Sequence, residues 1–88
     1  MNTINFEEPI RAVPLWLLRA YLEELGGTLE GDYAVRGANW YAYLTQLHDY
    51  EVGSLRIGQV YIAFEGDTNA LQPIREGLTV KLQTRGGG

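Results

Sequence analysis

Apolar residues recur at steps of three and four positions near the start of the chain. The pattern consists of Leu15, Leu18, Leu22 and Leu25. Such spacing places side chains on one face of a helix, so the sequence predicts a helix over residues 14–25. Pro14 suits the first turn, where the N–H that it lacks has no helical partner, and Gly26 suits a left-handed cap at the end.

After this helix, alternating apolar and polar residues separated by turn signals predict four antiparallel strands. Their expected ranges are 28–30, 33–36, 40–50 and 55–65. Two-residue hairpin signals occur at 31–32 and 53–54, and residues 37–39 form a third turn. In the last strand the apolar phase changes at Gly58, where a β-bulge would restore one continuous buried face.

The two ends of the chain carry weaker patterns. Residues 3–8 alternate as a short strand does, and a second helix is predicted over 69–76, capped by Asp67 or Thr68. Residues 78–84 fit both a helix and a strand, and 85–88 are expected to form a flexible glycine tail. The order strand, helix, four strands, helix predicts a single α+β domain, with its helices packed on one sheet face.

Composition narrows the classes of function. The 88 residues include 7 basic and 11 acidic side chains, a net charge of −4, and no cysteine. Phosphate-backbone binding needs clustered cations, so we expect neither nucleic acid nor a membrane as a partner. Without cysteine, disulfides and thiolate chemistry are excluded. We expect a cytoplasmic domain, since the N-terminus has no signal-peptide pattern.

The residues that most often carry catalysis are sparse. In a hairpin through residues 53–54, Val52 pairs with Leu55 and Tyr50 with Ile57, which puts His48 near Gln59. Ser54, the single serine, is then roughly 20 Å from His48 along the strand, too far for a nucleophile pair. Alternation points His48 and Asp49 to opposite faces, which argues against a metal site. We therefore expect no catalytic residue, metal or cofactor, and no enzyme activity.

The strand predicted over 40–50 is apolar on both faces. Trp40, Ala42 and Leu44 share one face, and Tyr41 and Tyr43 lie on the other. One face should pack on the helices, and the other should be covered by a partner chain or a ligand. We expect an interaction surface formed by Tyr41, Tyr43 and Tyr61, most simply in a homodimer. The alternative is an exposed sheet face whose tyrosine hydroxyls meet water.

The last residues are three glycines, and Gly87-Gly88 matches the ending of ubiquitin-like sulfur carriers. Such carriers end in Gly-Gly because a chain without side chains can enter the narrow channel in which its carboxylate is adenylated. The alternative is a frayed tail. The predicted order of elements argues against a carrier, because a β-grasp carrier begins with a hairpin before its helix.

The chain resembles a known domain in four segments: 14–18, 21–28, 52–57 and 85–88. They are similar to the C-terminal domain of MoaD-related proteins, a small bacterial domain of unknown function. There it follows a ubiquitin-like domain of the molybdopterin-synthase small-subunit type. The resemblance covers residues 12–88 and implies a TATA-binding-protein-like fold, with a second helix running past Gly77. It implies no activity.

These observations favour a non-enzymatic accessory or interaction domain, associated with molybdopterin cofactor or sulfur-carrier pathways. Its partner would be a second copy or a cofactor-biosynthesis protein. Two alternatives stay open. One is a sulfur or protein carrier acting through Gly88, and the other is a small-molecule binding module with a cleft between the sheet and the C-terminal segment.

Overall fold

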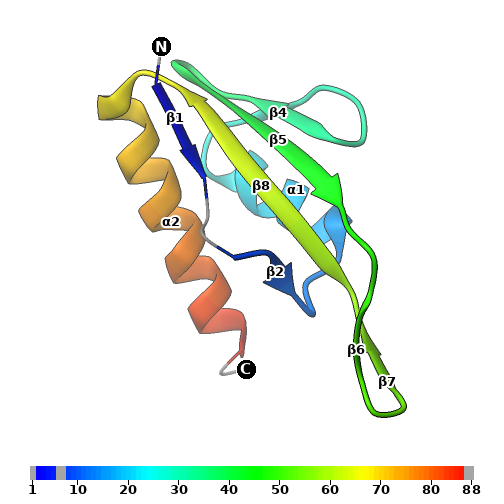
Figure 1. The fold of residues 1–88 in the computed structure, drawn as a ribbon. Helices are drawn as coiled ribbons and strands as arrows, with labels where there is room; N and C mark the ends of the chain where they lie inside the picture. The colour runs from blue at the N-terminus through cyan, green and yellow to red at the C-terminus, as the bar shows by residue number, and fades with distance from the viewer. Residues whose placement is uncertain (1, 6–7, 87–88) are drawn as a thin grey trace.

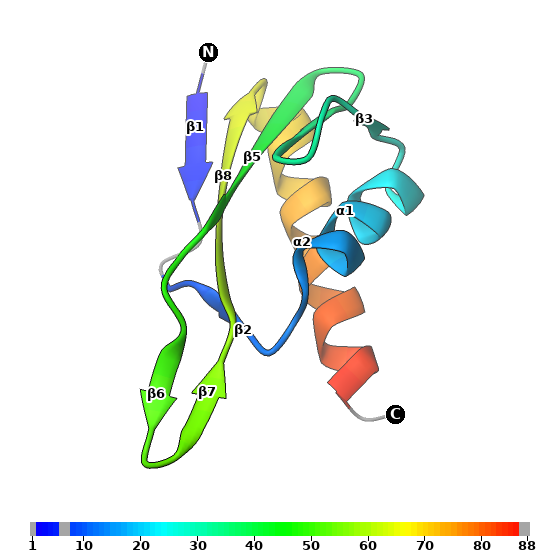
Figure 2. The same ribbon diagram turned by 90° about the vertical axis from the view of Figure 1, so that its right-hand side faces the viewer.

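Two helices cover one face of an antiparallel sheet in the computed structural model, which describes residues 2–5 and 8–86 (Figure 1). In chain order the elements are β1 (Asn2–Asn5), β2 (Ile10–Arg11), α1 (Leu15–Glu24), β3 (Thr28–Leu29), β4 (Ala34–Arg36), β5 (Trp40–Gln46), β6 (Tyr50–Val52), β7 (Leu55–Ile57), β8 (Gln59–Gly66) and α2 (Thr68–Gly86). The predicted α+β class and the packing of both helices on one face are confirmed (Figure 2).

The sheet is built around its two longest strands. Its order is β1-β8-β5-β4-β3, and β2 pairs with the other end of β8. The β5–β8 ladder runs from Trp40 opposite Gly66 to Gln46 opposite Val60. Although β1 and β2 both precede α1, each pairs with β8. The described chain therefore has no hairpin of the β-grasp type before its first helix.

Helix α1 follows the sequence pattern closely. Pro14 stands at its N-cap, and Leu18 and Leu22 are fully buried on its inner face. Gly26 has a φ of 103°, the left-handed conformation predicted for the residue that ends this helix. The helix predicted over 14–25 is thus confirmed within one residue at either end.

Helix α2 is longer than the pattern predicts. It begins after Asp67, whose Oδ1 accepts a hydrogen bond from the Asn69 N–H, and it continues to Gly86. Residues 78–84, which fitted both a helix and a strand, are therefore helical. Gly77 lies at a close approach of the two helices, since a Cβ there would be 2.7 Å from Leu25 Cδ2. The glycine that weakens helix propensity thus permits helix packing.

The two long predicted strands each break near the end that adjoins the turn at 53–54. Strand β5 ends at Gln46 and β6 begins at Tyr50, while Gly58 separates β7 from β8. The predicted phase change at Gly58 is real, but the expected continuous buried face is wrong, because Leu55 is 64% exposed. Strands β6 and β7 form a separate hairpin that projects beyond the part of the sheet covered by helices (Figure 2). The helices therefore cannot bury it.

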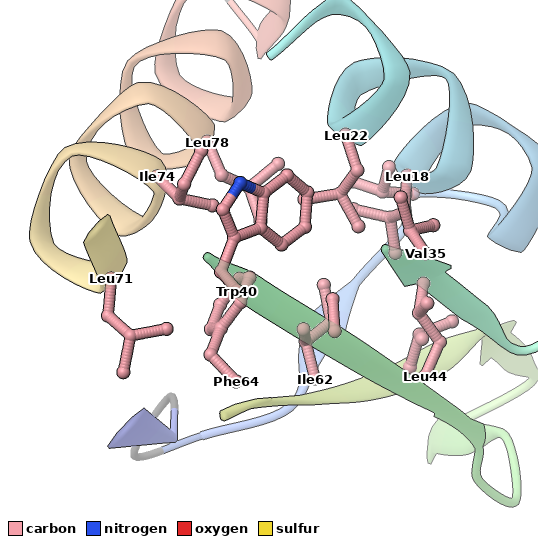
Figure 3. Packing of buried hydrophobic residues seen from close by; sticks show 13 residues of the cluster. Leu18, Leu22, Val35, Trp40, Leu44, Ile62, Phe64, Leu71, Ile74 and Leu78 are labelled. Carbon is pink, nitrogen blue, oxygen red and sulfur yellow. The ribbon is translucent and has the colours of Figure 1, made fainter. Parts of the chain in front are cut away.

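The core lies between the helices and the inner face of β5 and β8. Its buried members are Val13, Leu18, Leu22, Val35, Trp40, Ala42, Leu44, Val60, Ile62, Phe64, Leu71, Ile74 and Leu78. Figure 3 shows the Trp40 indole among them, with Leu22 of α1 on one side and Ile74 of α2 on the other. Gly37 must lack a side chain, because a Cβ there would be 1.8 Å from Trp40 Cε2.

The outermost predictions fall partly outside the described residues. The strand predicted over 3–8 corresponds to β1, and residues 6–7 lie outside the description. Of the predicted glycine tail, Gly86 is the last residue of α2, and Gly87 and Gly88 lie outside the described residues.

Candidate interaction surface

The outer face of the sheet carries three tyrosines on two adjacent strands. In β5, Trp40, Ala42 and Leu44 point to the core, so Tyr41 and Tyr43 point away from it. In β8, the fully buried Ile62 fixes Tyr61 on the same outer side. The structure therefore places all three predicted tyrosines on one face.

Their strand register brings these side chains within reach of one another. Tyr43 lies opposite Ala63, and Tyr61 is two positions from Ala63, so Tyr61 is a diagonal neighbour of Tyr43. The Tyr41 and Tyr43 rings are tilted at 36°, with centroids 4.7 Å apart. Tyr43 is 45% exposed. Figure 2 shows both helices on the opposite side of the sheet, which leaves this aromatic face without a helical cover.

An ion pair and a hydrogen bond order one end of this face. Arg36 Nε lies 2.8 Å from Glu30 Oε2, and the Tyr41 hydroxyl donates a hydrogen bond to Glu30 Oε1. The Arg36 guanidinium is also 5.6 Å from the centroid of the Tyr41 ring. The hydrogen bond to Glu30 raises the pKa of Tyr41 above its ordinary value, and burial adds to the effect. Tyr41 is therefore held as a neutral donor.

Glu30 and Arg36 were not singled out from the sequence. The predicted two-residue turn at 31–32 would pair Glu30 with Tyr33 and would place Glu30 and Arg36 on opposite faces. The observed loop is one residue longer, because the Glu30 N–H donates to the Ala34 carbonyl oxygen. The predicted turn is therefore wrong, and the changed register is what puts Glu30 and Arg36 on the same face as Tyr41.

The projecting hairpin has two chemically different faces. We call residues 50–57 the arm. Val52 lies opposite Leu55 and Tyr50 opposite Ile57, as predicted, so these four side chains share one apolar face. Leu55 is 64% exposed and Val52 48% exposed. Glu51 and Arg56 form an ion pair of 3.3 Å on the other face.

A hydrogen-bond network fixes the base of the arm. Gln59 Oε1 accepts from Arg11 Nε and Gln59 Nε2 donates to the His48 carbonyl oxygen, both at 2.9 Å. The Gln46 side chain donates to the Gln59 carbonyl oxygen, also at 2.9 Å. The Arg11 guanidinium lies 4.0 Å from the centroid of the Tyr50 ring. Side-chain amides thus replace ladder hydrogen bonds where the two long strands separate.

The remaining candidate sites are the surroundings of His48, a metal site and a small-molecule cleft. His48 is exposed and lines an open hollow of about 600 Å³ at the base of the arm, which also includes Asp49 and Gln59. No cluster of three or more potential metal ligands occurs within residues 2–5 and 8–86. A second hollow, of about 520 Å³, is lined by α2 residues alone and so is not a cleft between sheet and helix.

The fold defines a small α+β domain with one covered and one uncovered sheet face. The family model for the archaeal MoaD-like protein matches residues 6–88, and the chain belongs to this family. This match confirms a MoaD-like relationship, whereas the resemblance to the C-terminal domain of MoaD-related proteins stays a prediction. A comparison with curated proteins gives no match. Within the part of the chain that the structure describes, no helix is long and apolar enough to cross a membrane.

Proposed function

We propose that the chain is a non-enzymatic accessory or interaction domain of the molybdopterin cofactor or sulfur-carrier pathways. Its binding surface is the outer sheet face formed by Tyr41, Tyr43 and Tyr61. Its partner is a second copy of the chain or a cofactor-biosynthesis protein. Membership in the archaeal MoaD-like family supports the link to these pathways.

The observation that carries the proposal is the difference between the two sheet faces. The inner face is buried by both helices, whereas Tyr43 on the outer face is 45% exposed. Tyrosine is enriched where proteins bind each other, because its ring buries a large apolar area and its hydroxyl keeps a polar contact. The ion pair of Glu30 with Arg36 adds a neutralised polar edge to this face.

The test is a double substitution, Tyr41→Ser with Tyr43→Ser, in the full chain. Both side chains point away from the core, so the fold should survive, which circular dichroism can check. We expect self-association in sedimentation, or capture of a partner from an extract of the native host, to weaken by tenfold or more, on the order of a hot-spot loss. The matched control is Val80→Ser, at a residue 56% exposed on α2.

Unchanged association of the double variant would exclude this face as the binding surface. Loss of association in the Val80→Ser control as well would point to a general effect on the surface, and would also contradict the proposal.

A second candidate function is a sulfur or protein carrier that acts through Gly88. The family match extends to residue 88, where the chain ends in Gly86-Gly87-Gly88. A carrier would be adenylated at its terminal carboxylate and would then receive sulfur or form a conjugate. Mass spectrometry of the C-terminal peptide from native protein separates the two candidates. Sulfur in place of oxygen, or a conjugate at Gly88, would replace the interaction proposal with the carrier function.

A further inference from the structure

The arm is ordered although the apolar side chains at its end are exposed. An isolated two-stranded hairpin is marginally stable in water, and an exposed apolar face does not stabilise it. Here the contacts of Arg11 and Gln59 at the base hold the hairpin in one direction. Leu55 and Val52 are nevertheless 64% and 48% exposed at its end. The arm therefore presents a preorganised apolar surface.

This surface continues the outer side of the sheet. Ile10 lies opposite Val60, which points to the core, so the next residue, Arg11, points outward. The guanidinium of Arg11 lies over the ring of Tyr50. Tyr50 and the side chains that share its face of the hairpin therefore lie on the same outer side of the molecule as Tyr43 and Tyr61. The molecule measures 42 × 25 × 23 Å. Along its longest dimension, the arm and the three tyrosines can form two separate contact regions.

The size of the arm indicates what covers it. A stable complex buries about 800 Å² on each partner, and the four side chains of one hairpin face supply well below that area. A second copy of the chain brings both an arm and an aromatic outer face. In a two-fold pair, every contact occurs twice, so the contact area of one arm on one face is doubled.

The charges permit such a pairing despite the net charge of −4. The Arg11 guanidinium lies over the Tyr50 ring on the apolar side of the arm. On the receiving face, Glu65 lies opposite Tyr41 in the strand register and on the same side of the sheet. An arm seated on the tyrosines would therefore bring a cation and a carboxylate into one interface, and complementary charges of this kind favour the pairing of two copies.

We infer that two copies of the chain form a symmetric dimer in which the arm of each copy docks on the Tyr41, Tyr43 and Tyr61 face of the other. This inference rests on the proposed function and extends it, because it names the partner and adds Tyr50, Val52, Leu55 and Ile57 to the interface. The arm supplies aliphatic side chains and the face supplies aromatic rings, a complementary pair within one sequence.

A complementation experiment tests this arrangement by sedimentation velocity. The native chain should sediment as a dimer, and the variants Leu55→Asp and Tyr43→Asp should each sediment as monomers. At protein concentrations well above those that suffice for the native chain, a one-to-one mixture of the two variants should form dimers again, because the Tyr43→Asp chain keeps its arm and the Leu55→Asp chain keeps its face. The mixed dimer retains one of the two contacts, so it should dissociate more readily than the native dimer. Val80→Asp is the control and should stay dimeric.

Each other result has a definite meaning. A monomeric native chain overturns the inference and leaves the proposed function to a different partner protein. A dimeric Leu55→Asp variant beside a monomeric Tyr43→Asp variant means that the faces pair without the arms, which overturns the inference and supports the proposed function. A dimeric Tyr43→Asp variant, or two monomeric variants that fail to complement, excludes the docking of arm on face. Circular dichroism of each variant confirms that it is folded.

Discussion

At the scale of single residues, Tyr41 links the sheet surface to its electrostatics. Its ring contacts Tyr43, its hydroxyl donates to Glu30, and Glu30 in turn holds Arg36. Tyr41 belongs to β5, Arg36 belongs to β4, and Glu30 directly follows β3. The cluster therefore forms only when these three strands are paired. The ion pair of Glu30 with Arg36, together with the Tyr41 hydroxyl, orients the tyrosine rings and forms one edge of the surface.

This contact predicts a pH dependence. The pKa of Tyr41 is raised from 10.0 in the folded chain, because the protonated hydroxyl donates to Glu30 and because burial disfavours the phenolate. The stabilisation is therefore complete below the unfolded pKa, and it is lost as the pH rises through the folded pKa. The native chain should be more stable than Tyr41→Phe at neutral pH, and this difference should shrink on the alkaline side of pH 10.

Thermal unfolding at several pH values, with phenolate absorbance followed in parallel, measures both effects. Tyr33→Phe removes an exposed hydroxyl outside this cluster and is the control. The assignment of the hydrogen bond would be contradicted if the native chain and Tyr41→Phe differed in thermal stability by the same amount at neutral and at strongly alkaline pH.

At the scale of elements, the fold could be predicted wherever the local pattern and the core agreed. The sequence predicted the leucine face of α1, the left-handed Gly26 after it and the register of the arm through residues 53–54. Each of these features depends on residues that are neighbours in the chain. The length of α2 could not be predicted, because the glycine at position 77 is explained by its contact with Leu25, the residue that follows α1. Local propensity cannot report such a contact.

The same limit applies to the long strands and to the site. The apolar phase of Leu55 and Ile57 predicted a continuous buried face, yet the β6–β7 hairpin extends away from both helices. What covers each strand depends on the whole molecule. The outward tyrosines followed from alternation alone, whereas the Glu30–Arg36 pair depended on the register of a neighbouring hairpin.

The arm should lose its fixed direction when its base network is removed. Gln59→Leu deletes the hydrogen bonds to Arg11 and to the His48 carbonyl oxygen, but it leaves the buried residues of β8 in place. Backbone amides of residues 50–57 should then exchange with solvent at least about tenfold faster, the effect of losing roughly 1.4 kcal/mol of protection against local opening.

Hydrogen exchange with mass spectrometry measures this change. Amides of β5 and β8 should keep their native rates, and Gln72→Leu, at an exposed position of α2, is the matched control. Unchanged exchange in the arm would show that the turn alone holds the hairpin, and it would remove the argument that the arm is preorganised.

At the scale of the whole molecule, the fold is one-sided. Both helices lie against one face of the sheet, and the tyrosines and the arm occupy the other side (Figure 2). A chain of 88 residues has one modest core, and here that core lies between the helices and one face of the sheet. The chain belongs to the archaeal MoaD-like family.

The most direct measurement of the central claim is hydroxyl-radical footprinting of the tyrosines, read by mass spectrometry. The protein is labelled at low concentration, then at high concentration and in extract of its native host. The account predicts that Tyr43 becomes protected under the second and third conditions, while Tyr33, which is 55% exposed away from this cluster, is labelled equally in all three. Equal labelling of Tyr43 under every condition would contradict the claim that the outer sheet face is a binding surface.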